Sequence, residues 1–103
     1  GRQLDGASST INILPEVVDK VGKLVEVHLD GGIRSGQDVI KAMCLGAKGT
    51  YIGRAFLYGL GALGKEGVTK ALDIIKTEAD MTMALCGKRD VHDLNRENIY
   101  TRT

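Results

Sequence analysis

Residues 29–36, with the sequence Leu-Asp-Gly-Gly-Ile-Arg-Ser-Gly, decide the fold of this chain of 103 residues. The run at 24–29 is rich in aliphatic and β-branched residues, which predicts a strand that ends at Asp30. Two glycines and Arg34 follow, and Ser35 can cap a helix that begins there. A strand, a tight turn and a helix are the repeating unit of α/β proteins. The N–H groups of a helix N-terminus beside an arginine favour binding of an anion, above all a phosphate.

A shorter copy of this arrangement lies farther along the chain. Residues 49–52 predict a second strand, and Gly53 and Arg54 stand between it and the next helix. Glycines allow the backbone to approach a ligand closely, and a guanidinium forms a forked bond to a phosphate. Asp30 suits a hydroxyl-bearing part of the ligand better, such as a ribityl or ribose chain. We therefore predict a two-loop phosphate site, the alternative being two turns with surface arginines and helix caps.

The rest of the chain predicts helices around these two strands. The first covers residues 16–21, with Pro15 in the first turn and Gly22 as the stop, and the second covers residues 35–45, with a Ser35–Asp38 capping box and Gly46 as the stop. The third covers residues 55–63 and is expected to be buried, and Gly64 breaks it. The fourth covers residues 66–86, with Gly87 as the stop. Residues 1–10 are expected to form a polar loop, residues 90–94 one helical turn capped by Asp90, and residues 95–103 a frayed end.

The order of these elements predicts parallel strands joined by right-handed crossovers. Two strands alone leave their edges open, so the chain either self-associates or forms the end of a larger α/β protein. An eight-stranded β/α barrel has about 250 residues and often binds phosphate with the loops after strands seven and eight. We therefore predict an α/β fold in which residues 1–103 are the C-terminal βα units, about the last two strands and their helices, of a TIM (β/α)8 barrel domain.

The composition argues against several other classes of protein. A net charge of +1 gives no electrostatic footprint for nucleic acid, and no apolar run approaches the roughly 20 residues that span a bilayer. Cys44 and Cys86 lack the spacing of a metal or redox motif, so we expect two buried, reduced thiols. His28 shares a strand face with Glu26 and belongs to no motif, so we expect a structural histidine. The sequence offers no metal cluster and no Ser/His/Asp set.

Five segments together resemble one family. They are Gly-Arg-Gln-Leu-Asp at 1–5, Asp-Gly-Gly-Ile-Arg-Ser-Gly at 30–36, Val-Ile-Lys-Ala-Met-Cys-Leu-Gly-Ala at 39–47, Ile-Gly-Arg-Ala-Phe-Leu-Tyr-Gly-Leu at 52–60 and Met-Ala-Leu-Cys-Gly at 83–87. The family is that of the FMN-dependent α-hydroxy acid dehydrogenases and oxidases, which includes flavin L-lactate dehydrogenases, mandelate dehydrogenase, glycolate oxidase and flavocytochrome b2.

The resemblance implies a β/α barrel with FMN at the C-terminal ends of its strands. The FMN ribityl-phosphate would be lined by Asp30, Gly31, Gly32, Ile33 and Arg34 and closed by Gly53 and Arg54. Arg2 would hold the substrate carboxylate, although its chemistry alone favours a solvated loop arginine. The catalytic base of the family is a histidine in a His-Gly-Gly-Arg run. We expect it just before Gly1, so no catalytic residue is expected in this chain.

The implied reaction is oxidation of an L-2-hydroxy acid, such as lactate, to the 2-oxo acid. Electrons would pass from FMN to a quinone, a cytochrome or oxygen. The parent protein would be a homo-oligomer, a tetramer, located in the cytoplasm or on the inner face of a membrane, and the chain alone would be inactive. Two other interpretations stay open: a different phosphate-binding barrel enzyme, similar to inosine monophosphate dehydrogenase, and a non-catalytic flavin- or phosphate-binding module.

Overall fold

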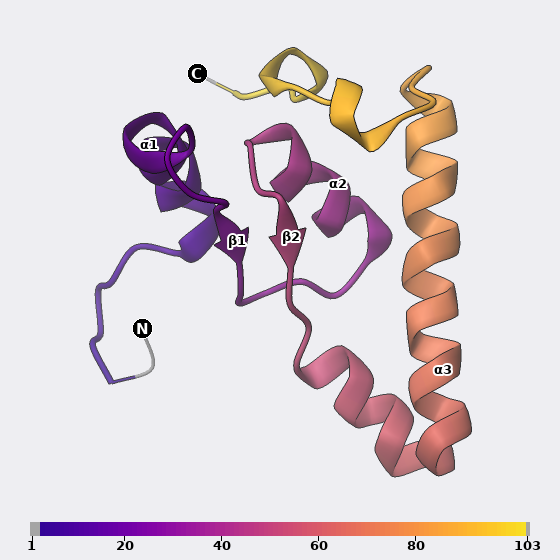
Figure 1. Ribbon diagram of the computed structural model, residues 1–103. Helices are drawn as coiled ribbons and strands as arrows, with labels where there is room; N and C mark the ends of the chain where they lie inside the picture. The colour runs from indigo at the N-terminus through magenta and orange to yellow at the C-terminus, as the bar shows by residue number, and fades with distance from the viewer. Residues whose placement is uncertain (1–2, 103) are drawn as a thin grey trace.

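The computed structural model describes residues 3–102. Its elements are α1 (Thr10–Val21), β1 (His28–Leu29), α2 (Gly36–Cys44), β2 (Gly49–Thr50), α3 (Arg54–Leu85) and two 3-10 turns, η1 (Val91–Asp93) and η2 (Arg96–Asn98). The strands β1 and β2 pair in parallel, with His28 opposite Gly49 and Leu29 opposite Thr50. The predicted order of strand, helix and parallel strand is therefore confirmed. Figure 1 shows the strand pair between α1 and α2, and the second half of α3 beyond α2.

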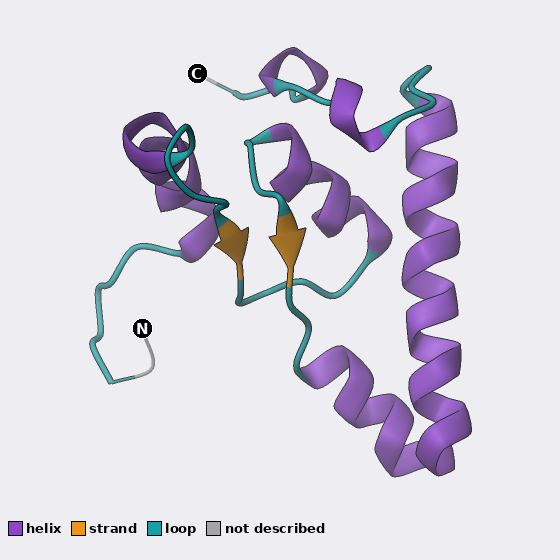
Figure 2. Ribbon diagram, viewed as in Figure 1, coloured by secondary structure: helices purple, strands orange, loops and turns teal. Residues whose placement is uncertain are grey.

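Both strands are shorter than predicted, as Figure 2 shows. The expected runs were 24–29 and 49–52, yet the paired residues are only two in each strand. The backbone bond from Lys48 N to Val27 O, 2.8 Å long, continues the pairing on one side. Leu24 and Val25 are 81% and 58% exposed, because no further described strand lies beside β1. A strand pattern in the sequence becomes a strand only where it has a partner.

Helix α1 begins earlier than predicted and contains Pro15 in its interior rather than in its first turn. Residues 10–14 are helical, although residue 10 was assigned to the polar loop and residues 11–14 to no element. Proline lacks the N–H for an intrahelical bond, but packing of an amphipathic face outweighs that loss. Leu14, on that face, is 4% exposed. Gly22 ends the helix as predicted.

The predicted stops at Gly46 and Gly87 are confirmed. Their φ angles, 102° and 68°, lie in the left-handed region that glycine adopts without strain. After each stop, a backbone amide turns back onto the helix. Ala47 N donates to Ala42 O and Lys88 N donates to Met83 O, both at 3.0 Å, which satisfies carbonyls that the helix end leaves open.

Helix α3 joins the two helices that were predicted on either side of Gly64. Leu63 and Gly64 have non-helical dihedrals, so the predicted break is present as a kink. The prediction that residues 55–63 are buried was wrong, because Tyr58 is 75% and Leu63 66% exposed. Within residues 3–102 nothing covers that side of the helix.

Two small apolar clusters hold these elements together. The first lies between α1, the strands and α2, and its buried members are Leu14, Leu29, Ile33, Ala42 and Ala47. The second lies between α2, α3 and the C-terminal segment, and its buried members are Ile40, Cys44, Met83 and Leu94. The helices therefore cover one side of the strand pair and leave its polar side open.

The C-terminal segment is more ordered than predicted. Asp90 caps η1 by accepting from His92 N at 2.9 Å. That bond, followed by the contact with the His92 side chain, lowers the pKa of Asp90. Fraying was expected from residue 95 onward, but Asn95 caps η2. Arg96 then forms a bidentate ion pair with Asp19 of α1, with N···O distances of 2.7 and 3.3 Å.

Candidate functional site

One cavity brings together all the predicted cofactor-binding residues. Its volume is about 110 Å³, and it is lined by Asp30, Gly31, Gly32, Ile33, Arg34, Tyr51, Gly53 and Arg54. Tyr51 is the lining residue that the sequence did not single out. Arg2, the predicted carboxylate ligand, lies outside the described residues. The two Gly/Arg loops therefore line one cavity, as their positions after neighbouring parallel strands predicted.

The pairing of β1 and β2 explains why the two loops meet. Tyr51 N donates to Leu29 O at 2.9 Å, one step beyond the last paired residues. Because the two strands run in the same direction, the chain leaves both of them at the same end of the sheet. The turn after Leu29 and the turn before Arg54 consequently lie next to each other, which places their arginines around one cavity.

The first turn depends on its glycines. Gly31 and Gly32 have φ angles of 99° and 83°, which other residues adopt only at a cost. A Cβ atom added at Gly32 or Gly53 would meet no described atom within 4 Å. The space beside these backbones is thus open to a ligand.

Asp30 is held by contacts from two directions. Its Oδ1 accepts from Gly31 N at 2.9 Å, and its carbonyl accepts from Thr10 Oγ1 at 2.8 Å. The first contact stabilises the turn from within, and the second ties it to the start of α1. Thr10 is a second residue that sequence reasoning missed. Its partner is 20 positions away, and nothing in the sequence near it indicates the contact.

The start of α2 is already occupied by its own cap. Ser35 Oγ accepts from Asp38 N at 3.2 Å, which confirms the predicted capping box. Asp38 Oδ2 in turn accepts from Ser35 N at 3.1 Å and from Arg34 N at 3.0 Å. These two amides are therefore not free to bind an anion. An anion at this helix start would have to use other amides of the first turn, such as that of Gln37.

The start of α3 has fewer of its own side chains competing for its amides. Within residues 3–102 no side chain caps this helix at Gly53, and its first turn contains no acidic residue. Its first amides and the positive end of its dipole adjoin the cavity, because Gly53 and Arg54 line it. The donors that remain for an anion thus include the Gly32 amide, the amides of the α3 start and the guanidinium groups of Arg34 and Arg54.

This set of donors fits a phosphate group. Two guanidiniums and several backbone amides favour a compact anion with several acceptor oxygens. Pockets that bury a whole drug-sized ligand measure roughly 300–1,000 Å³. At about 110 Å³ the cavity is smaller, so it suits one end of a larger molecule.

His28 has a partner at each ring nitrogen. Its Nδ1 lies 3.1 Å from the Tyr51 hydroxyl and its Nε2 lies 3.3 Å from Glu26 Oε2. The rings of His28 and Tyr51 are tilted at 41°, with centroids 5.8 Å apart. These contacts agree with the prediction of a structural histidine.

The cysteines agree with their prediction in part. Both are free thiols and Cys44 is buried, but Cys86 is exposed at the end of α3. Burial, followed by the nearby Cys86, raises the pKa of Cys44 above its ordinary value. Cys44 is thus a protonated core residue, whereas Cys86 is accessible.

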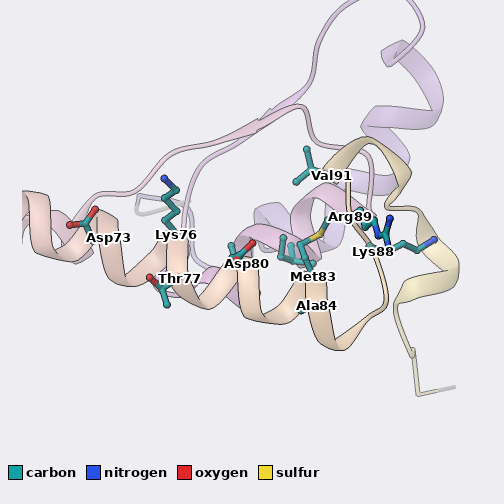
Figure 3. Close-up of a pocket in the computed structure, with 11 residues that line it drawn as sticks. Asp73, Lys76, Thr77, Asp80, Met83, Ala84, Lys88, Arg89 and Val91 are labelled. Atoms are coloured by element: carbon teal, nitrogen blue, oxygen red, sulfur yellow. The ribbon is translucent and has the colours of Figure 1, made fainter.

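A larger cavity lies elsewhere, along the second half of α3 (Figure 3). It measures about 770 Å³ and is lined by side chains of both charge signs, including Asp73, Lys76, Asp80, Lys88 and Arg89.

Among residues 3–102 no group of three His, Cys, Asp or Glu side chains could hold a metal ion. In the same range, no helix has the length and apolar character that crossing a membrane requires.

Comparison with known proteins places the chain among flavin enzymes. Residues 1–101 match the family model described as FMN-dependent dehydrogenase. The chain is 48% identical to the peroxisomal (S)-2-hydroxyacid oxidase GLO3 of Arabidopsis thaliana, over 98% of this chain and 28% of the relative. It is 50% identical to an L-lactate dehydrogenase of Caulobacter vibrioides, over 99% of this chain and 27% of the relative. The chain thus spans little more than a quarter of these relatives.

Solved structures agree with this assignment. A soluble mutant of the membrane-associated (S)-mandelate dehydrogenase from Pseudomonas putida matches with a TM-score of 0.90 and 38% identity, over 96% of this chain and 28% of that one. A flavocytochrome b2 variant with sulfite bound matches with a TM-score of 0.87 and 41% identity, over 94% and 26%. The predicted fold, βα units of a (β/α)8 barrel, is confirmed.

Proposed function

This chain belongs to the family of FMN-dependent dehydrogenases, and from that premise we propose that its strand-end cavity binds the phosphate end of FMN. The whole protein would oxidise an L-2-hydroxy acid, such as lactate, to the 2-oxo acid. Residues 1–103 would be the C-terminal part of one FMN-binding barrel domain. The observation that carries the proposal is the meeting of two Gly/Arg loops around one cavity.

Six of the eight lining residues have a role in this proposal. Arg34 and Arg54 would bind the phosphate oxygens with charge-assisted hydrogen bonds, and Gly31, Gly32 and Gly53 would let the phosphate approach the backbone. The Asp30 oxygen that does not accept from Gly31 would accept from a ribityl hydroxyl.

Arg2 would bind the substrate carboxylate and so orient the carbon that is oxidised. When bound, FMN supplies the redox chemistry, and the protein supplies binding and orientation.

The electron acceptor and the assembly belong to the proposal as well. Relatives are named as dehydrogenases, oxidases and a flavocytochrome, so a quinone, a cytochrome or oxygen would each suit the family. We propose a homotetrameric parent in the cytoplasm or on the inner face of a membrane. The membrane-associated relative supports the second location. Sedimentation and fractionation of the intact parent protein would test both.

The two other interpretations are weaker. A barrel similar to inosine monophosphate dehydrogenase would share the Asp30 turn but not the family match over residues 1–101. A non-catalytic module would bind the same phosphate without turnover. Binding and turnover must therefore be measured separately.

The binding experiment compares FMN with riboflavin, which differs by the phosphate alone. We expect the chain to bind FMN more tightly, and Arg34→Gln or Arg54→Gln to reduce that preference. Loss of a hydrogen bond to a charged group costs about 1.5–3 kcal/mol, or roughly a 10- to 150-fold weaker FMN affinity. Flavin fluorescence titration measures the affinities. Arg89→Gln is the matched control, because it removes an exposed arginine that lines the cavity along α3. It should change neither the FMN affinity nor the riboflavin affinity.

Equal affinity for FMN and riboflavin in the unaltered chain would sink the phosphate assignment. Turnover is tested by lactate-dependent dye reduction with added FMN. We expect none from the 103-residue chain, because the histidine implied as base is not among its residues. Dye reduction at a rate proportional to chain concentration would contradict this expectation.

A further inference from the structure

We propose that Tyr51 and His28 form a cross-strand pair that sets the spacing of the two phosphate-binding loops, which makes both of them positioning residues for the cofactor. This inference rests on the proposed function and deepens it. It assigns a role to two side chains that carry no part of the ligand contacts described above.

The two side chains occupy the open face of the strand pair. Leu29, next to His28, is buried against the helices at 2% exposure, so successive residues of β1 point to opposite faces. His28 is opposite Gly49 in the register, and Tyr51 follows two positions later. The Tyr51 hydroxyl and His28 Nδ1 are 3.1 Å apart, so the pair bridges the strands on the face away from the helices.

Gly49 makes room for this bridge. A Cβ atom added there would lie 3.2 Å from two atoms of the His28 ring, which is a tight approach. With glycine at that position, the imidazole can lie across the backbone of β2 and reach the hydroxyl of Tyr51. Glu26 Oε2, 3.3 Å from Nε2, holds the other end of the ring.

The pair stands directly beneath the two loops. His28 lies two residues before Asp30, where the first loop begins, and Tyr51 lies two residues before Gly53, where the second begins. Tyr51 also lines the cavity itself. A ladder of two residues per strand constrains the register weakly, whereas a cross-strand side-chain pair adds a further constraint. The separation of Arg34 from Arg54 therefore depends on this bridge.

The test measures the ratio of riboflavin to FMN dissociation constants, because that ratio reports phosphate recognition and not stability. We expect Tyr51→Phe, which removes only the hydroxyl, to lower the ratio about two- to tenfold, as loss of one ordinary hydrogen bond does. His28→Leu should lower it equally, and the double variant should lower it no further. His28→Asn keeps a polar atom at the Nδ1 position and should restore most of the ratio. Tyr58→Phe, at an exposed tyrosine of α3, is the matched control.

Each outcome decides the matter. A ratio near one in the unaltered chain overturns the proposed function, and this inference with it. A clear preference for FMN that Tyr51→Phe leaves unchanged overturns this inference alone. Independent, additive losses in the double variant also overturn it, because a bridge can be broken only once. Urea unfolding of each variant shows that the chain is folded in the titrations.

Discussion

Thr10 connects the start of α1 to Asp30, which lines the cavity. Its hydroxyl donates to the Asp30 carbonyl, so Thr10→Val removes the donor while keeping the size of the side chain. We expect a loss of about 0.5–1.5 kcal/mol in the free energy of unfolding by urea. FMN affinity should fall as well, because the Asp30 turn loses a tie that fixes its place.

Thr69→Val provides the comparison for this prediction. Thr69 Oγ1 donates to Lys65 O at 3.2 Å within α3, so the same kind of bond is lost far from the cavity. Stability should change modestly and FMN affinity should not. If both variants bind FMN as the unaltered chain does, Thr10 has no part in positioning the turn.

The two cysteines should differ in reactivity. Cys86 is exposed, whereas Cys44 is buried and burial raises its pKa, so at neutral pH Cys44 stays a thiol. A disulfide reagent that follows thiol release should therefore show one fast and one slow reaction. Because a raised pKa keeps the reactive thiolate scarce until the pH is high, the slow rate should increase with pH. Cys86→Ser should abolish the fast phase, and two equally fast thiols would contradict the structure.

Many individual residues of the candidate site were predicted from the sequence. Glycine and arginine after a strand form a local pattern with a chemical reason, and all such residues in the described range line the cavity. Tyr51 was missed because an aromatic residue near a strand end is common and carries no signal of its own. Thr10 was missed because its contact depends on where α1 packs, which local sequence does not specify.

The two halves of α3 meet at a pair of glycines. A Cβ atom at Gly67 would overlap the Gly59 carbonyl, so the halves can approach this closely only without side chains. Gly67→Ala must push them apart and should cost about 1–3 kcal/mol of unfolding free energy, as overpacking does. Gly61→Ala is the matched control on the same helix, since its Cβ would meet no described atom within 4 Å.

The control should change stability in the opposite direction. Alanine is favoured over glycine in a helix by roughly 1 kcal/mol, so Gly61→Ala should stabilise the chain slightly. Urea midpoints of the two variants test the pair. Similar midpoints would mean that the kinked helix does not keep its halves in contact.

Elements were predicted better in kind than in extent. The capping box at Ser35 and the stops at Gly46, Gly64 and Gly87 have local chemistry, and all are present. The lengths of the strands and the start of α1 depend on partners. An apolar run such as residues 55–63 favours burial, but it does not specify a surface that covers it.

Across the whole molecule, many large apolar side chains of the described residues are exposed. Large apolar side chains that are at least half exposed occur in the loops, beside β1 and along α3, among them Leu4, Leu24, Val25, Leu57, Leu63 and Leu85. The pair of strands also has open edges. Both features favour association with further protein surface.

We therefore expect the chain to self-associate when it is studied alone. Sedimentation velocity over a wide range of concentrations should show larger species as the concentration rises. Val25→Lys, which places a charge beside β1, should reduce the association, whereas Leu4→Lys in the N-terminal loop should matter less. A single monomer boundary at every concentration would refute this expectation.

The ion pair between Asp19 and Arg96 joins positions that are 77 residues apart, and the same guanidinium also donates to Pro15 O at 3.2 Å. A ribosome makes α1 long before it makes Arg96. During translation α1 can therefore pack its apolar face against the strands before the residue that pairs with Asp19 on its outer side has been made. The ion pair between α1 and η2 therefore becomes possible only after α2, β2 and α3 have been made.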